Sequence, residues 1–577
     1  MQLDPQAKRQ AETWLASSIA ESDKAVIRSW MDTDPAALNE AFYTDLEFGT
    51  GGLRGIMRLG SNGINKYTLG LATQGLANYL LHHIRLHVRV AIAYDSRNQS
   101  DTLARDVAQV LAANGIHVFL FPSLRPTPQL SFSVRQYGCH AGIVLTASHN
   151  PKEYNGYKVY WDDGGQLVPP HDQAILRAVR DIQLDDIRWE GGEDRIAEFG
   201  EDADQEYLQK VAQLSMNPGM GNANLNLVFT ALHGTSITMV PPALERFGFK
   251  NVHVLEAQAT PDGNFPTVQS PNPEEPAALA LAIEKAQELH ADMVIGCDPD
   301  TDRVGIAVRN DHQDMVILNG NQAASVLVDY VLHQHQAQGS MPDNPFVAST
   351  VVTTPLLERI ASSYGVPTYH TLTGFKWIAD LIRRYEGQQT FVVGGEESYG
   401  YLVGDFVRDK DAVSSAAMLA EAAAWNKAKG SSFYEHLLQL YVKHGVHHES
   451  LLSVTKKGRE GAEAIAGIME RFRSAPPAEL AGMAVEAILD FKTGLTTYLA
   501  DGRQETIDLP ASNVIQLRLA NGDRVTARPS GTEPKIKYYF CALGPHLDPD
   551  QPAQQYRAHR SELEARIAAY TEVITAL

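Results

Sequence analysis

One pattern in this sequence constrains the fold more than any other, because it occurs three times. A short apolar run is followed by a loop rich in functional groups and then by a second apolar run. The first runs span 142–145, 292–296 and 390–393, and the returning runs span 157–161, 304–308 and 399–403. Such runs, alternating with helical stretches, are typical of strands in βαβ units. Their unequal spacing excludes a solenoid. The pattern predicts three related α/β domains that each offer one loop to a shared central cleft.

The two ends of the chain follow different patterns. Asp4-Pro5 predicts a helix N-cap followed by proline at the first helical position, and it opens a charged helical extension that runs to about Leu46. Beyond about Leu451 we expect a helix at 459–473 and a hairpin around Asn521-Gly522, then a last strand and a terminal helix. This arrangement predicts a separate α+β domain at the C-terminus.

A chain of 577 residues is too long for one hydrophobic core. We expect the fold to be α/β, with three related mixed or parallel α/β domains and the C-terminal α+β domain around the central cleft. The predicted divisions are 1–215, 216–320, 321–450 and 451–577.

The composition restricts the partners of the protein. A formal net charge of −20 argues against nucleic acid and against an anionic membrane. An anionic small ligand would then need a local cluster of cations, which can act because charges are screened over about 8 Å at physiological salt. The three cysteines form no ligand pattern, and the N-terminus lacks the basic and apolar regions of a signal peptide. A cytoplasmic location is therefore expected.

The loop Thr146-Ala147-Ser148-His149-Asn150-Pro151 follows the first apolar run. Pro151 biases Asn150 away from helix, so Ser148 should sit on a stiffened turn at a strand end. With His149 and Lys158 nearby, Ser148 could carry a covalent group. Taken alone, such a loop is more often an ordinary polar turn between two strands.

The second loop places Asp298, Asp300 and Asp302 within five residues. Like charges this close are unfavourable unless a cation neutralises them, and ligands that are all oxygen suit Mg²⁺. An EF-hand is excluded, because its sixth and twelfth positions would be Arg303 and Arg309. A solvated acidic turn is the alternative. Three carboxylates leave coordination sites open, and a phosphate oxygen on Ser148 could fill one.

Four further stretches suggest binding of an anionic, hydroxylated ligand. Arg528-Pro529-Ser530-Gly531-Thr532 offers a guanidinium fork, two hydroxyls and a close backbone approach, as a phosphate site requires. Glu396 and Ser398 could accept from and donate to sugar hydroxyls. The glycine-rich stretch 48–55 and the group Thr373, Gly374 and Lys376 are weaker signals, which a loop or a plain surface would also explain.

Taken together and in chain order, these loops resemble the α-D-phosphohexomutase superfamily, and specifically its long phosphoglucomutase/phosphomannomutase branch. The resemblance runs from Phe48-Gly-Thr-Gly-Gly-Leu-Arg-Gly to Arg528-Pro-Ser-Gly-Thr-Glu-Pro-Lys. It implies four domains, the last similar to TATA-binding protein. It also implies that Ser148 is a phosphoserine, and that its phosphate binds Mg²⁺ together with Asp298, Asp300 and Asp302.

The same resemblance implies roles for the remaining residues. It places Arg54 and Arg303 beside the phosphoserine, Lys158 and His149 near the reacting oxygen, and Glu396 and Ser398 on the sugar; the remaining substrate contacts would come from Thr373, Gly374, Lys376, Arg528, Ser530, Gly531, Thr532 and Lys535. Lys410 resembles a lysine proposed as the proton shuttle. The bacterial phosphomannomutase/phosphoglucomutase branch has a histidine where Gly400 stands here, so no acid/base role carries over to that position.

The implied reaction moves a phosphoryl group between the 1- and 6-positions of a hexose, with glucose 1,6-bisphosphate as intermediate. Lys410 or Lys158 would need a lowered pKa to accept the substrate proton. The alternatives are a phosphomannomutase, a phosphopentomutase, a glucose 1,6-bisphosphate synthase, or a non-catalytic regulator with the same fold. We expect a monomer or weak dimer that acts on a small phosphosugar.

Overall fold

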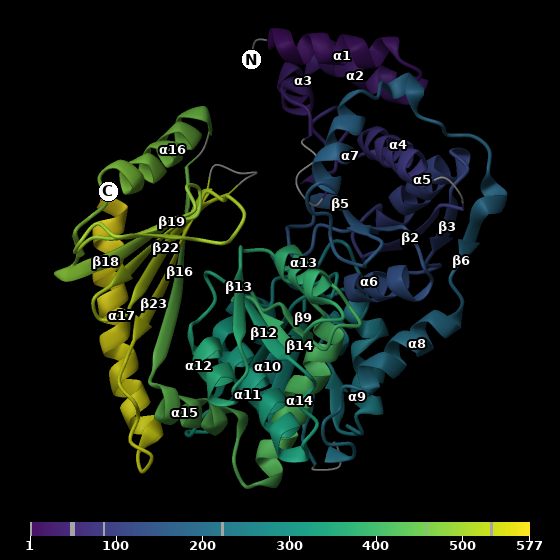
Figure 1. The fold of residues 1–577 in the computed structure, drawn as a ribbon. Helices are drawn as coiled ribbons and strands as arrows, with labels where there is room; N and C mark the ends of the chain where they lie inside the picture. Colours follow the sequence, from purple (N-terminus) through teal and green to yellow (C-terminus); the bar gives the residue numbers. More distant parts are fainter. Residues whose placement is uncertain are drawn as a thin grey trace.

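The computed structural model describes residues 3–46, 52–84, 87–220, 224–456, 458–530 and 535–576 (Figure 1). Three helices form the N-terminal extension: α1 (Pro5–Ala16), α2 (Glu21–Thr33) and α3 (Pro35–Phe42). The Asp4 carboxylate accepts from the backbone N–H groups of Gln6 and Ala7, which confirms the expected N-cap. The extension packs on the first α/β domain, where Trp14 contacts the ring of Tyr67 edge-on.

Each of the first three domains contains one mixed sheet. Sheet I comprises β1 (Gly52–Ile56), β2 (Arg89–Tyr94), β3 (His117–Leu120), β4 (Ala141–Leu145), β5 (Tyr154–Trp161) and β6 (Ile196–Glu198). Sheet II comprises β7 (Leu227–Thr230), β8 (Val252–Val254), β9 (Met293–Cys297), β10 (Val304–Arg309) and β11 (Met315–Leu318). Sheet III comprises β12 (Pro345–Thr350), β13 (Thr368–Thr371), β14 (Thr390–Gly395) and β15 (Tyr401–Val403).

These three sheets share one four-strand unit. The spatial orders β3-β2-β4-β5, β8-β7-β9-β10 and β13-β12-β14-β15 are the same when each is read in chain order. In each unit the first three strands are parallel and the last is antiparallel. The antiparallel strand is the returning run of the sequence pattern, so each functional loop is a hairpin connection at the end of a buried parallel strand. The prediction of three related α/β domains is confirmed.

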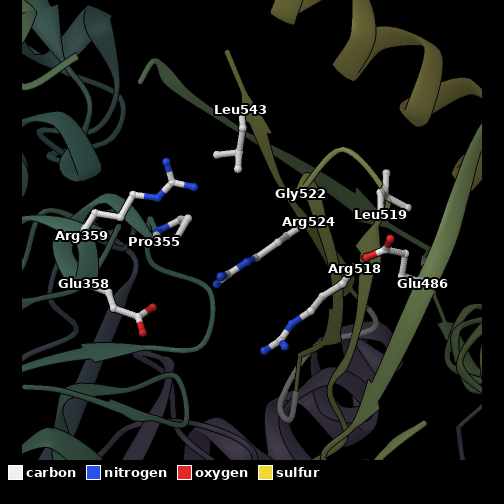
Figure 2. Close-up of a pocket in the computed structure, with 9 residues that line it drawn as sticks. All are labelled: Pro355, Glu358, Arg359, Glu486, Arg518, Leu519, Gly522, Arg524 and Leu543. Atoms are coloured by element: carbon white, nitrogen blue, oxygen red, sulfur yellow. The ribbon is translucent and has the colours of Figure 1, made fainter. Parts of the chain in front are cut away.

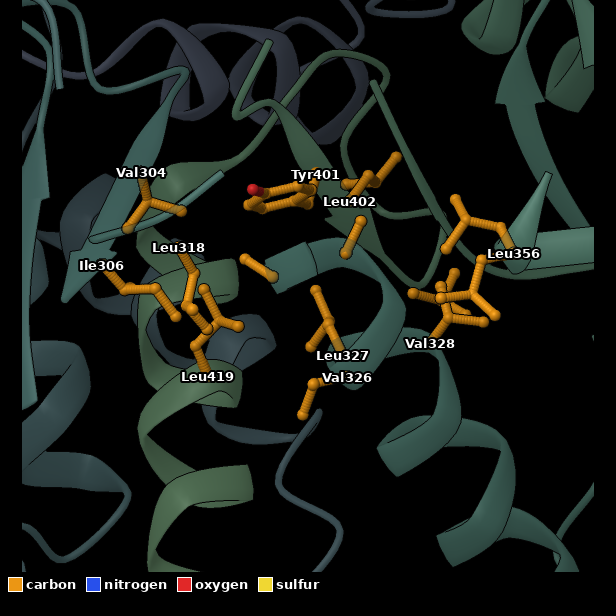
Figure 3. Packing of buried hydrophobic residues seen from close by; sticks show 14 of the residues in the cluster. Val304, Ile306, Leu318, Val326, Leu327, Val328, Leu356, Tyr401, Leu402 and Leu419 are labelled. Atoms are coloured by element: carbon orange, nitrogen blue, oxygen red, sulfur yellow. The ribbon is translucent and has the colours of Figure 1, made fainter. Parts of the chain in front are cut away.

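Helices cover the faces of these sheets. Domain I contributes α4 (Lys66–His83), α5 (Ser100–Ala113), α6 (Thr127–Gln136), α7 (His171–Arg180) and α8 (Glu201–Ala212). Domains II and III contribute α9 (Val240–Arg246), α10 (Pro276–Glu288), α11 (Gly320–Gln338), α12 (Leu356–Ser363), α13 (Phe375–Tyr385), α14 (Ala412–Ala428) and α15 (Phe433–His444). Helices α11 and α14 are buried almost all round. Helix α14 contacts β9 and β10 of sheet II and β15 of sheet III, and α11 contacts β14 and α14. Figure 3 shows Ile306, Leu327 and Leu402 in this shared core.

The C-terminal domain is an antiparallel sheet with helices, as predicted for an α+β domain. Its strands are β16 (His447–Thr455), β17 (Glu479–Leu480), β18 (Met483–Asp490), β19 (Leu495–Tyr498), β20 (Gln504–Thr506), β21 (Ile515–Leu519), β22 (Arg524–Pro529) and β23 (Lys535–Leu543). Helices α16 (Gly458–Ser474) and α17 (Pro552–Ala576) complete it. Strand β16 begins at His447, so the division expected at 450 falls within it. The resemblance to TATA-binding protein and the central cleft stay predictions.

Among the residues described, none of the helices combines the length and the apolar character needed to cross a bilayer.

Candidate active site

In each α/β domain, the parallel strand next to the antiparallel one ends in a loop that contains one strained residue. Ser148, Thr301 and Tyr399 have φ angles of 53°, 60° and 64°. This is a left-handed backbone conformation that residues other than glycine seldom adopt. Backbone strain of this kind costs about 1–3 kcal/mol and persists only where the surroundings impose it, most often at functional sites. The three loops therefore share a residue in the left-handed conformation as well as the same position in the fold.

Ser148 lies between β4 and β5, and its side chain is directed at the aspartates of the second domain. Its hydroxyl donates to Oδ2 of Asp298 at 2.9 Å and lies 3.1 Å from Nδ1 of His149. Burial lowers the pKa of His149 well below its usual range, and the charges of Arg303 and Arg54 lower it further. His149 is therefore a neutral imidazole beside the serine oxygen. The structure thus brings together Ser148 and Asp298, which are 150 positions apart.

The backbone of the serine loop is held by Arg97, a residue to which the sequence analysis assigned no role. Its guanidinium donates to the carbonyl oxygens of Ser148 at 2.7 Å and of Pro151 and Tyr154 at 2.9 Å, and also to that of Asn150. Asp95 pairs with the other side of this guanidinium at 3.3 Å, and both side chains are fully buried. The signal available in the sequence is Asp95-Ser96-Arg97 at the end of a buried strand.

Asp298, Asp300 and Asp302 converge, with one carboxylate oxygen from each lying within 4.8 Å of the others. All three are at most 1% exposed. Burial raises the pKa of Asp298 well above its usual range, and the neighbouring Asp300 and Asp302 raise it further. Burial would also raise the pKa of Asp302, but Lys158, Lys410 and Arg303 lower it below its usual range.

This carboxylate set fits a divalent cation. Oδ1 of Asp300 and Oδ1 of Asp302 are buried and accept no hydrogen bond from the described residues. Buried carboxylate oxygens that lack a donor are costly, and a hard cation is the partner that an all-oxygen donor set prefers. Thr127 stabilises the loop from domain I, because its hydroxyl donates to Oδ2 of Asp300 at 3.0 Å and its N–H to the carbonyl of the same residue.

Two lysines flank the aspartates. Nζ of Lys158 lies 2.7 Å from Asp300 and 3.0 Å from Asp302, and Nζ of Lys410 lies 3.1 Å from Asp302 and 3.2 Å from Asp409. Burial would lower the pKa of each lysine, but these carboxylates raise it above the usual range. The arrangement therefore differs from the lowered pKa expected of a proton acceptor, because the aspartates stabilise the charged form.

The loop between β14 and β15 lies against Lys410. Glu396 is 4% exposed and accepts from the N–H of Gly374 at 2.8 Å, which joins two of the stretches singled out in the sequence. The hydroxyl of Thr373 is buried and has no partner among the described residues. Ser398 is half-buried. Burial lowers the pKa of Lys376, whose ammonium lies 5.0 Å from the ring centre of Trp377.

Gly400 is needed because Lys410 passes directly over it. A Cβ atom at Gly400 would lie 2.0 Å from Cδ and 2.7 Å from Cγ of Lys410. No side chain fits here unless Lys410 moves. Lys410 thus fills the space that a histidine at this position would need.

The C-terminal domain presents Arg528 toward Tyr539, whose hydroxyl lies 3.5 Å from Nη1. The backbone N–H of Ser530 donates to the carbonyl of Lys535 at 2.7 Å, which closes the base of the loop. Gly531 and Thr532 lie outside the described residues. Sequence reasoning missed Lys537, which stands directly opposite Arg528 in the β22–β23 ladder. Like charges in this position are destabilising by themselves, and an anion bound between them would offset the repulsion.

Comparison with known proteins identifies the family. Residues 45–186, 205–312 and 319–441 match the models of phosphoglucomutase/phosphomannomutase domains I, II and III. The phosphoglucomutase of Staphylococcus aureus strain MRSA252 is 37% identical over 541 residues, which cover 93% of this chain and 96% of that protein.

The chain belongs to the phosphoglucomutase/phosphomannomutase family.

Two solved structures share the fold of this chain. A putative phosphomannomutase from Thermus thermophilus has a TM-score of 0.67 at 22% identity, and the match covers 90% of this chain and 99% of that one. The open form of the Paramecium phosphoglucomutase parafusin has a TM-score of 0.63 at 18% identity, over 92% and 96% of the two chains. The resemblance predicted from the sequence loops is confirmed.

Two family arginines are engaged with other residues in this arrangement. Arg54, on β1, donates to the side-chain oxygen of Asn150 at 3.4 Å. Arg303 pairs with Glu274 through its guanidinium, and its backbone N–H donates to Oδ1 of Asp298 at 3.0 Å. Both lie close enough to lower the pKa of His149, so both stand near the serine loop. Their predicted contact with a phosphoserine stays a prediction.

Proposed function

We propose that this member of the phosphoglucomutase/phosphomannomutase family interconverts glucose 1-phosphate and glucose 6-phosphate through a phosphoserine at Ser148. The observation that carries the proposal is the 2.9 Å contact between the Ser148 hydroxyl and a buried cluster of three aspartates. A serine oxygen in that position can bear a phosphoryl group whose charge is balanced across the site. The curated relatives that match nearly the whole chain support the same activity.

In the proposed cycle, the bond between phosphorus and Oγ of Ser148 breaks as a hydroxyl of the hexose monophosphate bonds to phosphorus. The product is glucose 1,6-bisphosphate. This intermediate reverses its orientation, and its other phosphoryl group returns to Ser148. The hydroxyl that attacks loses its proton to the enzyme, and the same proton is returned to the departing sugar oxygen in the second half of the cycle.

We assign the transfer of that proton to Lys410, because its side chain lies between Asp302 and the sugar loop that contains Glu396 and Gly400. Lys158 pairs with Asp300 and Asp302 and would balance their charge. Mg²⁺ held by Asp298, Asp300 and Asp302 would supply Lewis acidity at the ester oxygen and would offset the carboxylate charge that keeps Lys410 protonated.

Two further sets of residues would contact the sugar and the phosphate that is not reacting. Glu396, Ser398 and Thr373 would bind hydroxyls, and Gly374 and Lys376 would stand beside them. Arg528, Ser530, Gly531, Thr532 and Lys535 would bind the phosphate that is not reacting. We propose domain divisions at 215, at 320 and just before β16, so that this phosphate seat lies on a domain of its own. A monomeric or weakly dimeric state and a cytoplasmic location also stay part of this proposal.

The experiment that tests the proposal is the mass of the intact protein before and after exposure to glucose 1,6-bisphosphate. Wild type should gain one phosphate, and Ser148→Ala should gain none. Ser325→Ala is the matched control, since Ser325 is also fully buried but lies in α11, where its hydroxyl bonds to Asn321. Normal turnover by Ser148→Ala would contradict the assignment. Comparing glucose 1-phosphate with mannose 1-phosphate and ribose 1-phosphate as substrates would identify the preferred sugar.

A further inference from the structure

A second concentration of positive charge lies between the third and fourth domains, away from the serine and aspartate loops. It surrounds a cavity of about 240 Å³. Arg359 of α12 approaches this cavity from domain III, and Arg518 of β21 and Arg524 of β22 approach it from domain IV. Figure 2 shows the side chains of Arg518 and Arg524 extending from the sheet toward α12. The whole chain has a net charge of −20, so three arginines around one small cavity form a positive region on an acidic protein.

The arginines from domain IV are only partly balanced by the protein, because the charge of Glu358 acts on both of them without a direct ion pair. Neither Arg518 nor Arg524 makes a side-chain hydrogen bond or ion pair with the part of the chain that the structure describes. Arg524 is half-buried. Burial lowers the pKa of its guanidinium from the usual value, as do the nearby charges of Arg518 and Arg359, while the charge of Glu358 opposes this shift. Removing a guanidinium from water is unfavourable when no carboxylate contacts it directly.

Two carboxylates also line the cavity, but they do not complete a salt-bridge network. Glu358 is engaged with the ring of His370 at 3.4 Å, and Glu486 is exposed on the opposite strand. Arg359 donates to the carbonyl of His444 at 2.9 Å, which leaves its other donors available. The cavity therefore keeps a surplus of donors that are suited to an acceptor with several oxygens.

We propose that this cavity is a binding site for a small phosphate-bearing anion that bridges domains III and IV. Guanidinium groups bind phosphate in a bidentate manner, and three of them from two domains can surround one phosphate. The volume suits inorganic phosphate or a phosphate ester of a few carbons, because sites for larger ligands commonly occupy about 300–1,000 Å³.

The position of the site gives it a mechanical link to the phosphate seat at Arg528. Arg524 and Arg528 lie on the same strand, β22, and alternate residues of a strand face the same side of the sheet. An anion that joins α12 to β22 would hold one end of this strand against domain III. Its occupancy would therefore restrict how domain IV, with Arg528, sits over the sugar loop.

Calorimetric titration of the full-length protein with inorganic phosphate tests this site. The titrations use an Arg528→Gln background, so that the seat at Arg528 does not contribute. We expect one phosphate to bind in that background. It should bind at least about tenfold more weakly after Arg524→Gln, because hydrogen bonds between charged groups are among the stronger ones. Arg359→Gln should weaken binding similarly from the other domain, and it serves as a second variant if Arg524→Gln does not fold. Titrating glycerol 3-phosphate in parallel distinguishes an ester from free phosphate by which binds more tightly.

Arg503→Gln is the matched control, since Arg503 lies in the same domain but pairs with Glu505 and stacks on Tyr498. Without phosphate, Arg524→Gln should melt at or above the temperature of the Arg528→Gln parent, because it removes one of three like charges around the cavity. If Arg528→Gln binds no phosphate, or if Arg524→Gln and Arg359→Gln bind it as tightly as the control does, the proposal is wrong. Both results are independent of mutase activity.

Discussion

The guanidinium of Arg97 lies 2.7 Å from the carbonyl oxygen of Ser148 and is fully buried against Asp95. Ser148 keeps its left-handed backbone because this side chain binds several carbonyls of the same loop at once. A charged hydrogen-bond donor thereby imposes a conformation that serine would not adopt in a free turn. Arg97 is a positioning residue, and it would act on the reaction only through the serine.

We predict that Arg97→Lys lowers kcat strongly and changes KM little. A lysine cannot reach the same set of carbonyls, so Ser148 would relax away from Asp298 while the sugar and phosphate contacts stay in place. Steady-state kinetics would measure this separation. Arg309→Lys is the control, because Arg309 also binds backbone carbonyls, those of Ala291 and Gln313, away from the site. A folded Arg97→Lys protein with wild-type kcat would refute the positioning role.

We predict that Gly400→Ala lowers kcat because the new methyl group displaces Lys410. The overlap with Cδ of Lys410 is too close to relieve without moving that side chain, and overpacking of this kind costs about 1–3 kcal/mol. Turnover and melting temperature should both fall. Gly200→Ala has open space around its Cβ position and should leave both unchanged. Wild-type kcat in Gly400→Ala would show that the place of Lys410 does not matter for the reaction.

We predict that Mg²⁺ raises the melting temperature of wild type and has no such effect on Asp300→Asn. A ligand present at 100 times its dissociation constant stabilises the folded state by about 2.7 kcal/mol. Asp300→Asn also loses the ion pair between Asp300 and Lys158, so the Mg²⁺ shift of each protein is measured against its own melting temperature without metal. Asp314→Asn, on the exposed surface of the same domain, is the control. Equal Mg²⁺ shifts in all three proteins would exclude the aspartate cluster as the site.

We predict that Lys537→Met raises KM for the sugar phosphate by about tenfold without destabilising the free protein. Lys537 adds a second cation directly opposite Arg528, so its loss should weaken anion binding and also relieve repulsion between like charges. Kinetics and thermal melting together would test both effects. Lys492→Met, an exposed position in the same domain, should alter neither. An unchanged KM would mean that Lys537 does not contact the phosphate.

We predict that the stability gap between Glu449→Gln and wild type widens in favour of the variant as pH rises from 5 to 7. Burial raises the pKa of Glu449 from 4.5 to about 7, although a hydrogen bond from Thr354 opposes this shift. The folded protein therefore holds a proton that the unfolded chain releases at lower pH, so the stability of wild type falls as pH rises through this range. Between pH 5 and pH 7 the gap should change by on the order of 2 kcal/mol, which urea unfolding at both pH values would measure. A constant gap would contradict the raised pKa.

Much of the local structure could be predicted from the sequence, because it depends on short-range patterns. The apolar run at 142–145 falls within β4, and the run at 304–308 falls within β10. Asn521-Gly522 does connect two antiparallel strands, and Asp4 does cap a helix. Turn chemistry, capping and alternating hydrophobicity act over a few residues, so they can be read from neighbours along the chain.

The roles of the buried charges could not be predicted in this way. Nothing near Arg97 in the sequence indicates which carbonyls it binds, and nothing near Lys410 shows that its side chain fills the space above Gly400. The charge state expected of Lys158 and Lys410 differed from the structure for the same reason. The pKa of a buried group depends on carboxylates that the fold brings within about 3 Å from distant positions.

The sequence by itself determined which chemical groups this protein possesses and at which strand ends they stand, since periodicity and turn residues specify strands, loops and their order. The tertiary structure alone decided that Ser148 meets Asp298, that the sheet of the fourth domain faces α12, and that two lysines stay charged. The physical reason is that electrostatic and packing energies depend on distance in space. Folding sets that distance, whatever the separation of two residues along the chain.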